Sequence, residues 1–502
     1  MNKKIRLAIN LLLILIFIIA LFSLKFAISF FGYQPLEEVF FHMSVPMEGT
    51  SQELIDKFLY NGIYLSLIVF GIILLFVIIT EILFKKKNVN LKLKNKTFKI
   101  LPINISSKII TIIMVILILL VALKASLFYK LFDYIGNILT SSTFIEENYV
   151  NPKNIDVTLP ENKRNLIYIY MESMESTYTS KENNGDFTDD LIPNLRLLAN
   201  NNINFSNTSN FGGLYQVEGA TWTIGAMVAQ TAGVPLKVPI GGNDFTSKYS
   251  SFLGGAYTLG DILNKNGYKQ EFLLGSDATF AGKDAFYSQH GNYDIVDYNA
   301  SIEKGYIASD YYEFWGYEDQ KLYEIAKKEL NDLASTSQPF NLTMLTVDTH
   351  TYGGYLSSYC ENKYSPQILS VISCEDIKMN EFINWIKEQP FYDNTTIVIT
   401  GDHLNMDSTI FDDYANRKIY NVFINSAIDT DYSKNRMATS LDMYPTILAS
   451  LGANIPGNKL GLGVNLYSED QTLTEKYGID YVNSELAKTS TFYNKNILKT
   501  SK

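Results

Sequence analysis

The apolar positions of this 502-residue chain gather in three long runs near its beginning. These runs cover residues 7–24, 59–84 and 109–128. An α-helix rises about 1.5 Å per residue, so about 20 apolar residues cross a hydrocarbon layer about 30 Å thick. The pattern therefore predicts a membrane anchor with three transmembrane helices within residues 1–130.

After residue 163 the pattern changes to short apolar runs that alternate with longer, partly polar segments. The short runs predict strands at residues 165–171, 270–274, 340–347, 394–400 and 422–424. The longer segments predict helices at residues 257–266, 314–333, 376–388 and 440–451. Strands that alternate with helices indicate a mostly parallel sheet flanked by helices. We therefore expect an α/β domain at residues 164–502, joined to the anchor by a linker at residues 131–163.

The charges between the apolar runs predict how the chain crosses the membrane. The N-terminus carries Lys3, Lys4 and Arg6, and the connection from residue 85 to 108 has eight lysines and no acid. The loop between the first two runs has five acids and two lysines. Because basic flanks stay in the cytoplasm, we expect a cytoplasmic N-terminus and an extracellular or periplasmic α/β domain. A cleaved signal peptide is the alternative, but no small-residue cleavage pattern follows the first run and two more runs come after it.

Net charge and cysteine content narrow the possible partners. The net charge is −10, with the acidic excess beyond residue 150. We therefore expect no nucleic-acid partner, because phosphate binding needs a basic surface. The two cysteines, Cys360 and Cys374, both lie in the part expected outside, where a disulfide can form. Two free thiols are the alternative, whereas a metal site built on two cysteines alone would lack ligands.

Acids and histidines follow three of the predicted strands. Glu172 follows the first strand, His350 comes soon after the strand at 340–347, and Asp402 and His403 follow the strand at 394–400. Ligands of open parallel sheets bind beyond the carboxyl ends of the strands. Carboxylate and imidazole groups suit Mn²⁺, Mg²⁺ or Zn²⁺. A single acid at such a place is commonly a helix cap, but this combination predicts a metal site.

A threonine near the start of a predicted helix is a candidate nucleophile. Thr221 lies two residues after Gly219 and shortly before the apolar run at residues 224–230. A threonine in this position is commonly a plain N-cap. The functional alternative is that helix N-termini favour phosphate groups, and that a bound cation lowers the pKa of a coordinated hydroxyl.

These motifs resemble the alkaline phosphatase and sulfatase superfamily. Within it, the chain resembles the lipoteichoic acid synthases and phosphoglycerol transferases, most of all the phosphoglycerol transferases I that decorate osmoregulated periplasmic glucans. The stretches that carry the resemblance are residues 166–178, 223–236, 280–286, 345–350 and 397–404. The likeness covers residues 165–465, and the two cysteines fall where that family has a pair.

The resemblance implies roles for individual residues. Glu172, Asp402, His403 and Thr221 would hold one divalent metal, most of all Mn²⁺, with Thr221 as the nucleophile. His350 would contact the phosphate or move a proton. Lys283 lies where lipoteichoic acid synthases carry an arginine that touches the phosphoglycerol.

One departure leaves the nucleophile open. In phosphoglycerol transferases I the threonine follows the glycine directly, which would place it opposite Ala220. The lipoteichoic acid synthases have one residue between, which fits Thr221. Thr223 is the second choice.

The function that the resemblance implies is glycerol phosphate transfer. The donor would be phosphatidylglycerol and the acceptor a hydroxyl of a cell-envelope glycan or glycolipid, with a covalent glycerophospho-threonine between the two steps. The alternatives are a lipoteichoic acid synthase that polymerises glycerol phosphate on a glycolipid, and a phosphoethanolamine transferase. An inactive ectodomain that only binds glycan is the alternative from a different class.

Overall fold

The computed structural model describes most of the chain. The described residues are 3–32, 35–44, 52–86, 90–93, 96–99, 105, 107–237, 251–350, 353–413 and 416–499. The chain forms two compact units. We call Met1–Tyr33 with Ser51–Phe132 the anchor unit, and Gln34–Thr50 with Asp133–Lys502 the α/β unit.

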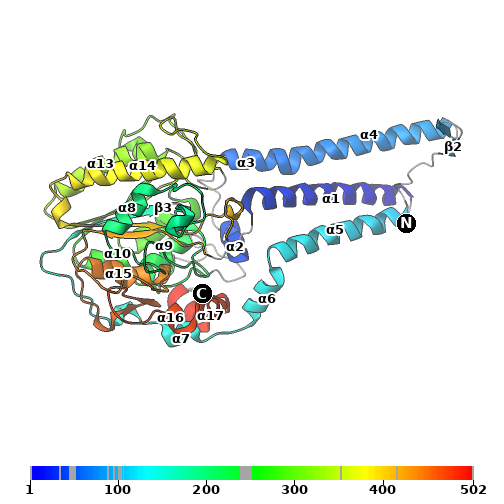
Figure 1. Cartoon of the computed structure of the whole chain (residues 1–502). Coiled ribbons are helices and arrows are strands. Elements are labelled where there is room, and N and C mark those ends of the chain that lie inside the picture. The colour runs from blue at the N-terminus through cyan, green and yellow to red at the C-terminus, as the bar shows by residue number, and fades with distance from the viewer. Residues whose placement is uncertain are drawn as a thin grey trace. The chain divides into compact units, whose positions relative to one another are not determined.

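Three long apolar helices make up most of the anchor unit (Figure 1). They are α1 (Lys3–Phe31), α4 (Leu65–Lys86) and α5 (Lys108–Phe128), and α1 packs against both others. The second span begins earlier, in α3 (Gln52–Phe58) and the π-helical turn Leu59–Tyr64. The stretches long and apolar enough to cross a membrane are Lys4–Phe30, Ile55–Thr80 and Lys108–Phe128, which confirms the three predicted spans.

A polar contact ties two of these helices together. Asn10 of α1 is buried and its amide donates to the carbonyl oxygens of Ile105 and Ser107, just before α5. Thr111 of α5 donates in return to Asn10 Oδ1 over 2.6 Å. Between α4 and α5 the chain forms a short antiparallel hairpin, β1 (Asn90–Leu93) and β2 (Lys96–Lys99).

The α/β unit is built on one six-stranded sheet, which confirms the predicted fold class. The strands are β3 (Asn165–Met171), β4 (Lys269–Leu274), β5 (Asp294–Val296), β6 (Phe340–Leu345), β7 (Thr395–Gly401) and β8 (Asn421–Ile424). Their order is β5-β4-β6-β3-β7-β8, and every neighbouring pair is parallel except β7 and β8. The central strands β6, β3 and β7 are therefore buried between neighbours, as their continuous apolar runs predict.

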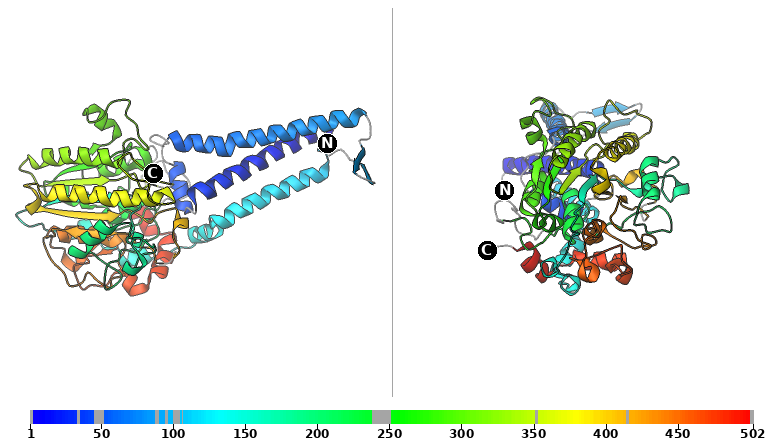
Figure 2. Two further views of the ribbon diagram at one scale, coloured as in Figure 1. Left: turned by 45° about the horizontal axis from the view of Figure 1, so that its top comes forward. Right: turned by 90° about the vertical axis from the view of Figure 1, so that its left-hand side faces the viewer.

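Helices cover both faces of the sheet (Figures 1 and 2). Side chains alternate along a strand, so Tyr168 and Tyr170 of β3 enter one hydrophobic cluster and Ile167 and Ile169 the other. The first cluster includes side chains of α9 (Thr223–Ala232), α10 (Leu259–Lys265) and α15 (Met443–Ser450). The second includes those of α8 (Pro193–Asn201), α13 (Asp319–Ala334) and α14 (Gln367–Lys387).

The α/β unit and the segment that leads into it also contain shorter helices. They are α2 (Leu36–Ser44), α6 (Leu131–Leu139), α7 (Phe144–Asn148), α11 (Lys283–Gln289), α12 (Tyr298–Glu303), α16 (Leu473–Tyr477), α17 (Ile479–Ala487) and α18 (Thr491–Tyr493). Within the expected linker at residues 131–163, Phe144 and Ile145 are buried in the first hydrophobic cluster. Much of that stretch is therefore a packed part of the α/β unit rather than a free connection.

Two predicted helices have different bounds in the structure. The helix predicted from residue 314 begins at Asp319, because Phe314 and Gly316 have positive φ angles that interrupt a helix. The helix predicted from residue 376 begins much earlier, at Gln367, directly after Pro366. Pro366 has an extended backbone at the N-cap position, which suits the start of a helix.

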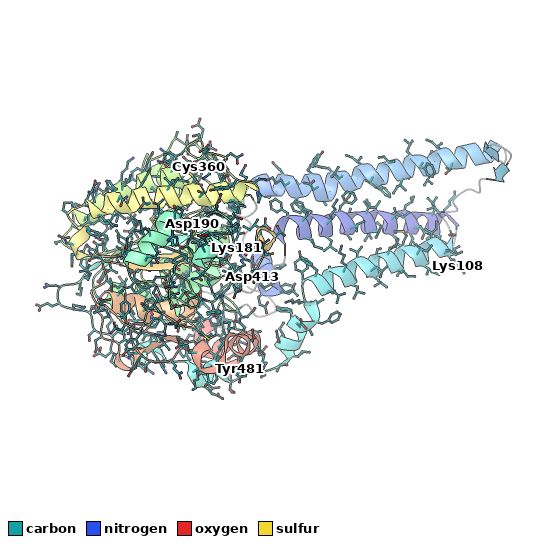
Figure 3. The ribbon with its side chains drawn as sticks, in the orientation of Figure 1. Lys108, Lys181, Asp190, Cys360, Asp413 and Tyr481 are labelled. Carbon is teal, nitrogen blue, oxygen red and sulfur yellow. A yellow bond between two sulfur atoms is a disulfide. The ribbon has the colours of Figure 1, made fainter. Side chains whose placement is uncertain are left out.

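Cys360 and Cys374 are joined by a disulfide in the structure, with their Cα atoms 5.6 Å apart. Figure 3 marks Cys360 at the edge of the unit, in the loop before α14. The bond joins this loop to the buried Cys374 of α14, which lies 14 residues further along the chain.

We expect this disulfide to stabilise the folded protein. In the full-length protein in detergent, the double variant Cys360→Ser, Cys374→Ser should lose about 3 kcal/mol of unfolding free energy, as expected for a loop of this length. Denaturant unfolding measures the loss. Reduced wild-type protein is the control and should match the variant. Complete labelling of both cysteines by a thiol reagent in denaturant without reductant would contradict the bond.

Candidate metal and nucleophile site

The candidate site lies at the carboxyl ends of the two central strands β3 and β7. Their parallel register sets Met171 opposite Gly401, so the next residues, Glu172 and Asp402, leave the sheet side by side. A Cβ atom on Gly401 would lie 2.0 Å from the carbonyl oxygen of Met174. Only glycine therefore permits this approach of the two chains.

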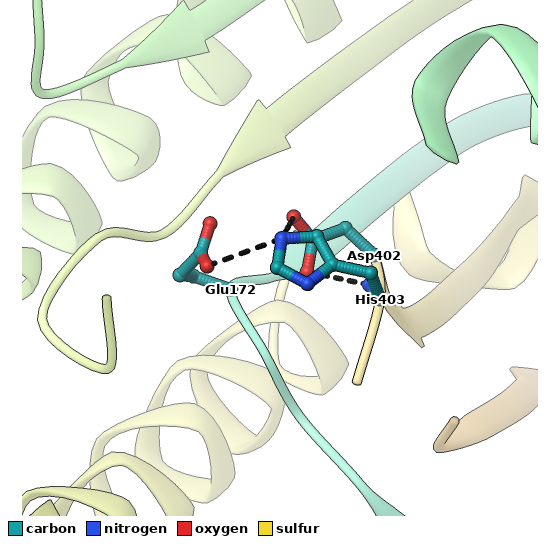
Figure 4. Close-up of side chains that lie close together, drawn as sticks. All are labelled: Glu172, Asp402 and His403. Carbon is teal, nitrogen blue, oxygen red and sulfur yellow. Dashed lines mark hydrogen bonds and ion pairs between the residues drawn. The ribbon is translucent and has the colours of Figure 1, made fainter. Parts of the chain in front are cut away.

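Three predicted metal ligands converge at this place (Figure 4). Glu172, Asp402 and His403 are all buried, and each offers a ligand atom within 4.8 Å of the others. His403 Nε2 lies 3.5 Å from Glu172 Oε1 and 3.3 Å from Asp402 Oδ2. The arrangement is the donor set of two carboxylates and one imidazole that divalent cations bind.

Hydrogen bonds prepare these side chains to bind a cation. His403 Nδ1 lies 2.8 Å from the carbonyl oxygen of Leu404, which selects the tautomer with a free lone pair on Nε2. Asp402 Oδ1 accepts from the backbone N–H groups of Ser173 and His403, both over 2.8 Å. Asp402 Oδ2 is buried and accepts no hydrogen bond from the described residues. A buried oxygen of this kind fits a metal ligand.

The electrostatics of the cluster also favour a cation. Burial and the neighbouring Glu172 raise the pKa of Asp402 to about 7. Burial alone would lower the pKa of His403, but the Asp402 and Glu172 carboxylates outweigh it and raise that pKa above its usual value. Two carboxylates in a buried space repel each other, and a bound divalent cation would offset this repulsion.

The structure places Thr223, rather than Thr221, against the predicted metal ligands. Thr223 is the first residue of α9, and its Oγ1 lies 3.3 Å from Glu172 Oε2 and 3.5 Å from His403 Nε2. Thr221 Oγ1 is buried and makes no hydrogen bond with the described residues. The N-cap of α9 is Trp222, so Thr221 does not cap the helix. The Thr221 assignment stays a prediction, and the contacts favour Thr223.

A buried glutamine on α9, missed in the sequence, fixes this helix to the site. Gln230 Nε2 donates to the carbonyl oxygens of Gly401 and Asp402 over 3.1 and 3.3 Å. Tyr168 of β3 donates to Gln230 Oε1 over 2.6 Å. The signal was available, because Gln230 is a polar residue inside an otherwise apolar run.

Lys283 and His350 are linked by two aromatic rings. The ammonium of Lys283 lies 5.0 Å from the ring centre of Phe280, whose ring centre is 5.3 Å from that of Trp315. Trp315 in turn lies 5.0 Å from the His350 ring. Burial lowers the pKa of Lys283 to about 8, against the opposing effect of nearby carboxylates that include Glu172. Lys283 is thus within electrostatic reach of the predicted metal ligands.

A second buried group of acids has a different character. Asp319, Asp348 and Glu375 also have oxygens close together, but Lys378 Nζ lies 2.6 Å from Asp348 Oδ2 and 2.9 Å from Glu375 Oε2. Asp319 accepts from the backbone N–H groups of Val347 and Asp348. This group therefore carries its own cation and fixes the turn that leads to His350.

A mostly parallel sheet that presents two carboxylates, an imidazole and a hydroxyl at the carboxyl ends of its strands is typical of α/β enzymes that bind a metal ion there. The family model described as Sulfatase matches residues 164–453, which include every residue of this centre. The chain belongs to the sulfatase family.

Two similar proteins carry the name phosphoglycerol transferase I. Phosphoglycerol transferase I of Escherichia fergusonii is 36% identical over 315 residues, which are 61% of this chain and 39% of that protein. Phosphoglycerol transferase I of Citrobacter koseri is 36% identical over 330 residues, 64% of this chain and 41% of that protein. The matched part is therefore about two fifths of the length of these relatives.

A solved structure shares the fold. The integral membrane protein lipooligosaccharide phosphoethanolamine transferase A (EptA) from Neisseria meningitidis has a TM-score of 0.50 and 11% identity. The match covers 88% of this chain and 84% of that one.

We expect the site to bind one divalent cation. The full-length protein in detergent, loaded with Mn²⁺ and dialysed, should retain one equivalent, and Asp402→Ala or His403→Ala should remove it because each substitution deletes a ligand. Elemental analysis measures the metal content. Glu182→Ala, which changes an exposed acid outside the candidate site, is the control. Unchanged Mn²⁺ content in a combined Asp402→Ala, His403→Ala protein would contradict the site.

Proposed function

We propose that this protein transfers glycerol phosphate from phosphatidylglycerol to a hydroxyl of a cell-envelope glycan. The observation that carries the proposal is the contact of the Thr223 hydroxyl with Glu172 and His403 at the start of α9. A hydroxyl held among metal-type ligands at a helix N-terminus suits attack on a phosphate ester. The names of the relatives, phosphoglycerol transferase I, support phosphoglycerol as the transferred group.

The centre would hold one divalent cation, for which we propose Mn²⁺, with Mg²⁺ and Zn²⁺ as alternatives. Glu172, Asp402, His403 and the nucleophilic threonine would be its ligands. When bound, the cation would stabilise negative charge on the reacting oxygens and lower the pKa of the threonine hydroxyl.

The first displacement would form a covalent intermediate. Thr223 Oγ attacks the phosphorus of phosphatidylglycerol, a new Oγ–P bond forms, and the P–O bond to diacylglycerol breaks. Diacylglycerol leaves with a proton, and glycerophosphate stays on the threonine. Lys283, and His350 on the turn after β6, would meet the phosphoryl oxygens and move the proton.

The second displacement would return the threonine. A hydroxyl oxygen of the acceptor attacks the same phosphorus, the Oγ–P bond breaks, and the proton of the acceptor passes to Thr223. The net reaction joins glycerophosphate to the acceptor and releases diacylglycerol. A lipoteichoic acid synthase would use the same steps, with the growing glycerol phosphate chain as the acceptor.

We further propose that the α/β unit lies outside the cytoplasm. The support is the distribution of charge between the spans, with lysines from residue 85 to 108 and acids in the loop between the first two spans. A donor lipid and an envelope glycan are both within reach of a domain anchored at that surface.

The nucleophile test compares two threonines of the same segment. Thr223→Ala should lower diacylglycerol release from head-group-labelled phosphatidylglycerol by roughly three orders of magnitude or more, because the covalent route is lost. Thr221→Ala should retain most turnover. Thr223→Ser, which keeps a hydroxyl, is the matched control and should keep measurable activity.

The opposite result would return the assignment to Thr221. Full activity in both alanine variants would exclude a threonine mechanism. If phosphatidylethanolamine rather than phosphatidylglycerol loses its labelled head group in wild-type protein, the chain is a phosphoethanolamine transferase.

Topology can be tested with single introduced cysteines, because the natural pair is bonded. Lys181→Cys changes an exposed residue of the α/β unit, marked in Figure 3, and Lys92→Cys lies in the lysine-rich connection. A membrane-impermeant maleimide should label Cys at position 181 in spheroplasts, and at position 92 only after lysis. The reverse pattern would show that the orientation is inverted.

A further inference from the structure

Helix α2 connects, in sequence, the first two membrane spans, yet it belongs to the α/β unit. Two of its side chains are buried: Phe41 is fully covered and Glu38 is 5% exposed. A carboxyl group this deeply buried costs free energy unless it is paired. The position of Glu38 therefore needs a physical explanation.

One side of α2 is directed at the candidate site. Glu38 and Phe41 are three residues apart and share a face of the helix. The Phe41 ring centre lies 6.0 Å from that of Trp222, the residue before Thr223. The Glu38 carboxyl interacts electrostatically with His403 and Glu172. Residues that are more than 130 positions apart in sequence thus meet at one place.

Side chains of α2 other than Glu38 also contact the α/β unit. The Phe40 ring centre lies 5.4 Å from that of Tyr134. The half-buried Glu37 interacts electrostatically with Lys237. Together with Phe41 these contacts hold α2 in the unit, so Glu38 is not required as an anchor.

Some polar atoms of α2, of the residues before α9 and of the candidate site have no hydrogen-bond partner among the described residues. Among the described residues, Glu38 Oε2, Thr221 Oγ1, Trp222 Nε1 and Asp402 Oδ2 are buried and make no hydrogen bond. A metal ligand role explains Asp402 Oδ2. The remaining three are a carboxyl oxygen, a hydroxyl and an indole N–H. Unpaired buried groups need an explanation, such as a bound water, ion or ligand.

The chemistry of these atoms identifies the ligand as a hydroxyl compound. An indole N–H only donates, whereas a hydroxyl group both accepts from it and donates to a carboxyl oxygen. Both substrates of the proposed reaction carry hydroxyl groups, the glycerol head group as a vicinal diol and the acceptor as a sugar.

We propose that α2 forms a wall of the substrate pocket and that Glu38 binds a substrate hydroxyl beside the catalytic centre. This inference rests on the proposed function and deepens it. The hydroxyl comes from the glycerol of the donor or from the acceptor, and the two sources predict different kinetic effects of the same substitution.

The experiment compares Glu38→Gln with Glu37→Gln in the full-length protein in detergent. If Glu38 holds the donor glycerol, Glu38→Gln lowers kcat/KM for phosphatidylglycerol by about ten-fold or more, as removal of one partner of a buried hydrogen bond does. Its rate with phosphatidylpropanol, which lacks the diol, stays at the wild-type value. If Glu38 holds the acceptor, diacylglycerol release is unchanged and KM for methyl β-glucoside rises by a similar factor.

A binding measurement separates this inference from the proposed function. sn-Glycerol 3-phosphate or methyl β-glucoside should raise the Tm of the wild-type protein and of Glu37→Gln, but not that of Glu38→Gln. Glu38→Asp, which keeps the carboxyl group, should recover part of the effect. This readout applies even if wild-type protein releases no diacylglycerol from phosphatidylglycerol, a result that would overturn the proposed function alone.

Equal behaviour of Glu38→Gln and Glu37→Gln in both kinetic arms and in the Tm shift would overturn the role of Glu38. So would an equal loss of rate with phosphatidylglycerol and phosphatidylpropanol, since that result indicates a structural effect without hydroxyl recognition.

Discussion

The pairing of β3 with β7 is the constraint on which the rest of the site depends. Neighbouring strands in a sheet lie about 4.8 Å apart. Residues that directly follow two neighbouring parallel strands in register are therefore close to each other. The register puts Glu172 next to Asp402, and the missing side chain of Gly401 lets the chain after β3 cross the end of β7. A shift of one residue would turn these side chains to the opposite face of the sheet.

The two buried groups of acids show what distinguishes a metal centre from a structural charge cluster. Lys378 supplies an ammonium that lies between Asp348 and Glu375 and offsets part of their negative charge. Around Glu172 and Asp402 the described residues provide the His403 imidazole and hydroxyl or N–H donors, and Asp402 Oδ2 accepts no hydrogen bond from them. A buried pair of carboxylates with no lysine or arginine in ion-pair contact among the described residues suits a divalent cation.

Most of the fold could be predicted because most of its strands are rich in apolar and β-branched residues, and the same argument located Glu172, Asp402 and His403 at strand ends. The three-residue strand β5, Asp294–Val296, is too short to produce a pattern. The choice between Thr221 and Thr223 depends on where α9 begins. Both threonines fit the sequence of a helix start, and the extended backbone of Trp222, with φ −140° and ψ 162°, decides which side chain faces the ligands.

No local pattern in the sequence predicts the contact of α2 with the site. In the sequence, the acids of the loop between the first two spans predict only the orientation of the chain in the membrane. Glu37 and Glu38 contribute the same charge and cannot be distinguished in this way. Packing separates them: Glu37 is half-buried and interacts electrostatically with Lys237, whereas Glu38 is buried, interacts electrostatically with His403 and has an oxygen without a hydrogen bond to the described residues. A segment between two membrane spans that contributes a group to the catalytic pocket ties the reaction to the anchored form of the protein, because an α/β domain released without residues 35–44 would lack this carboxyl group.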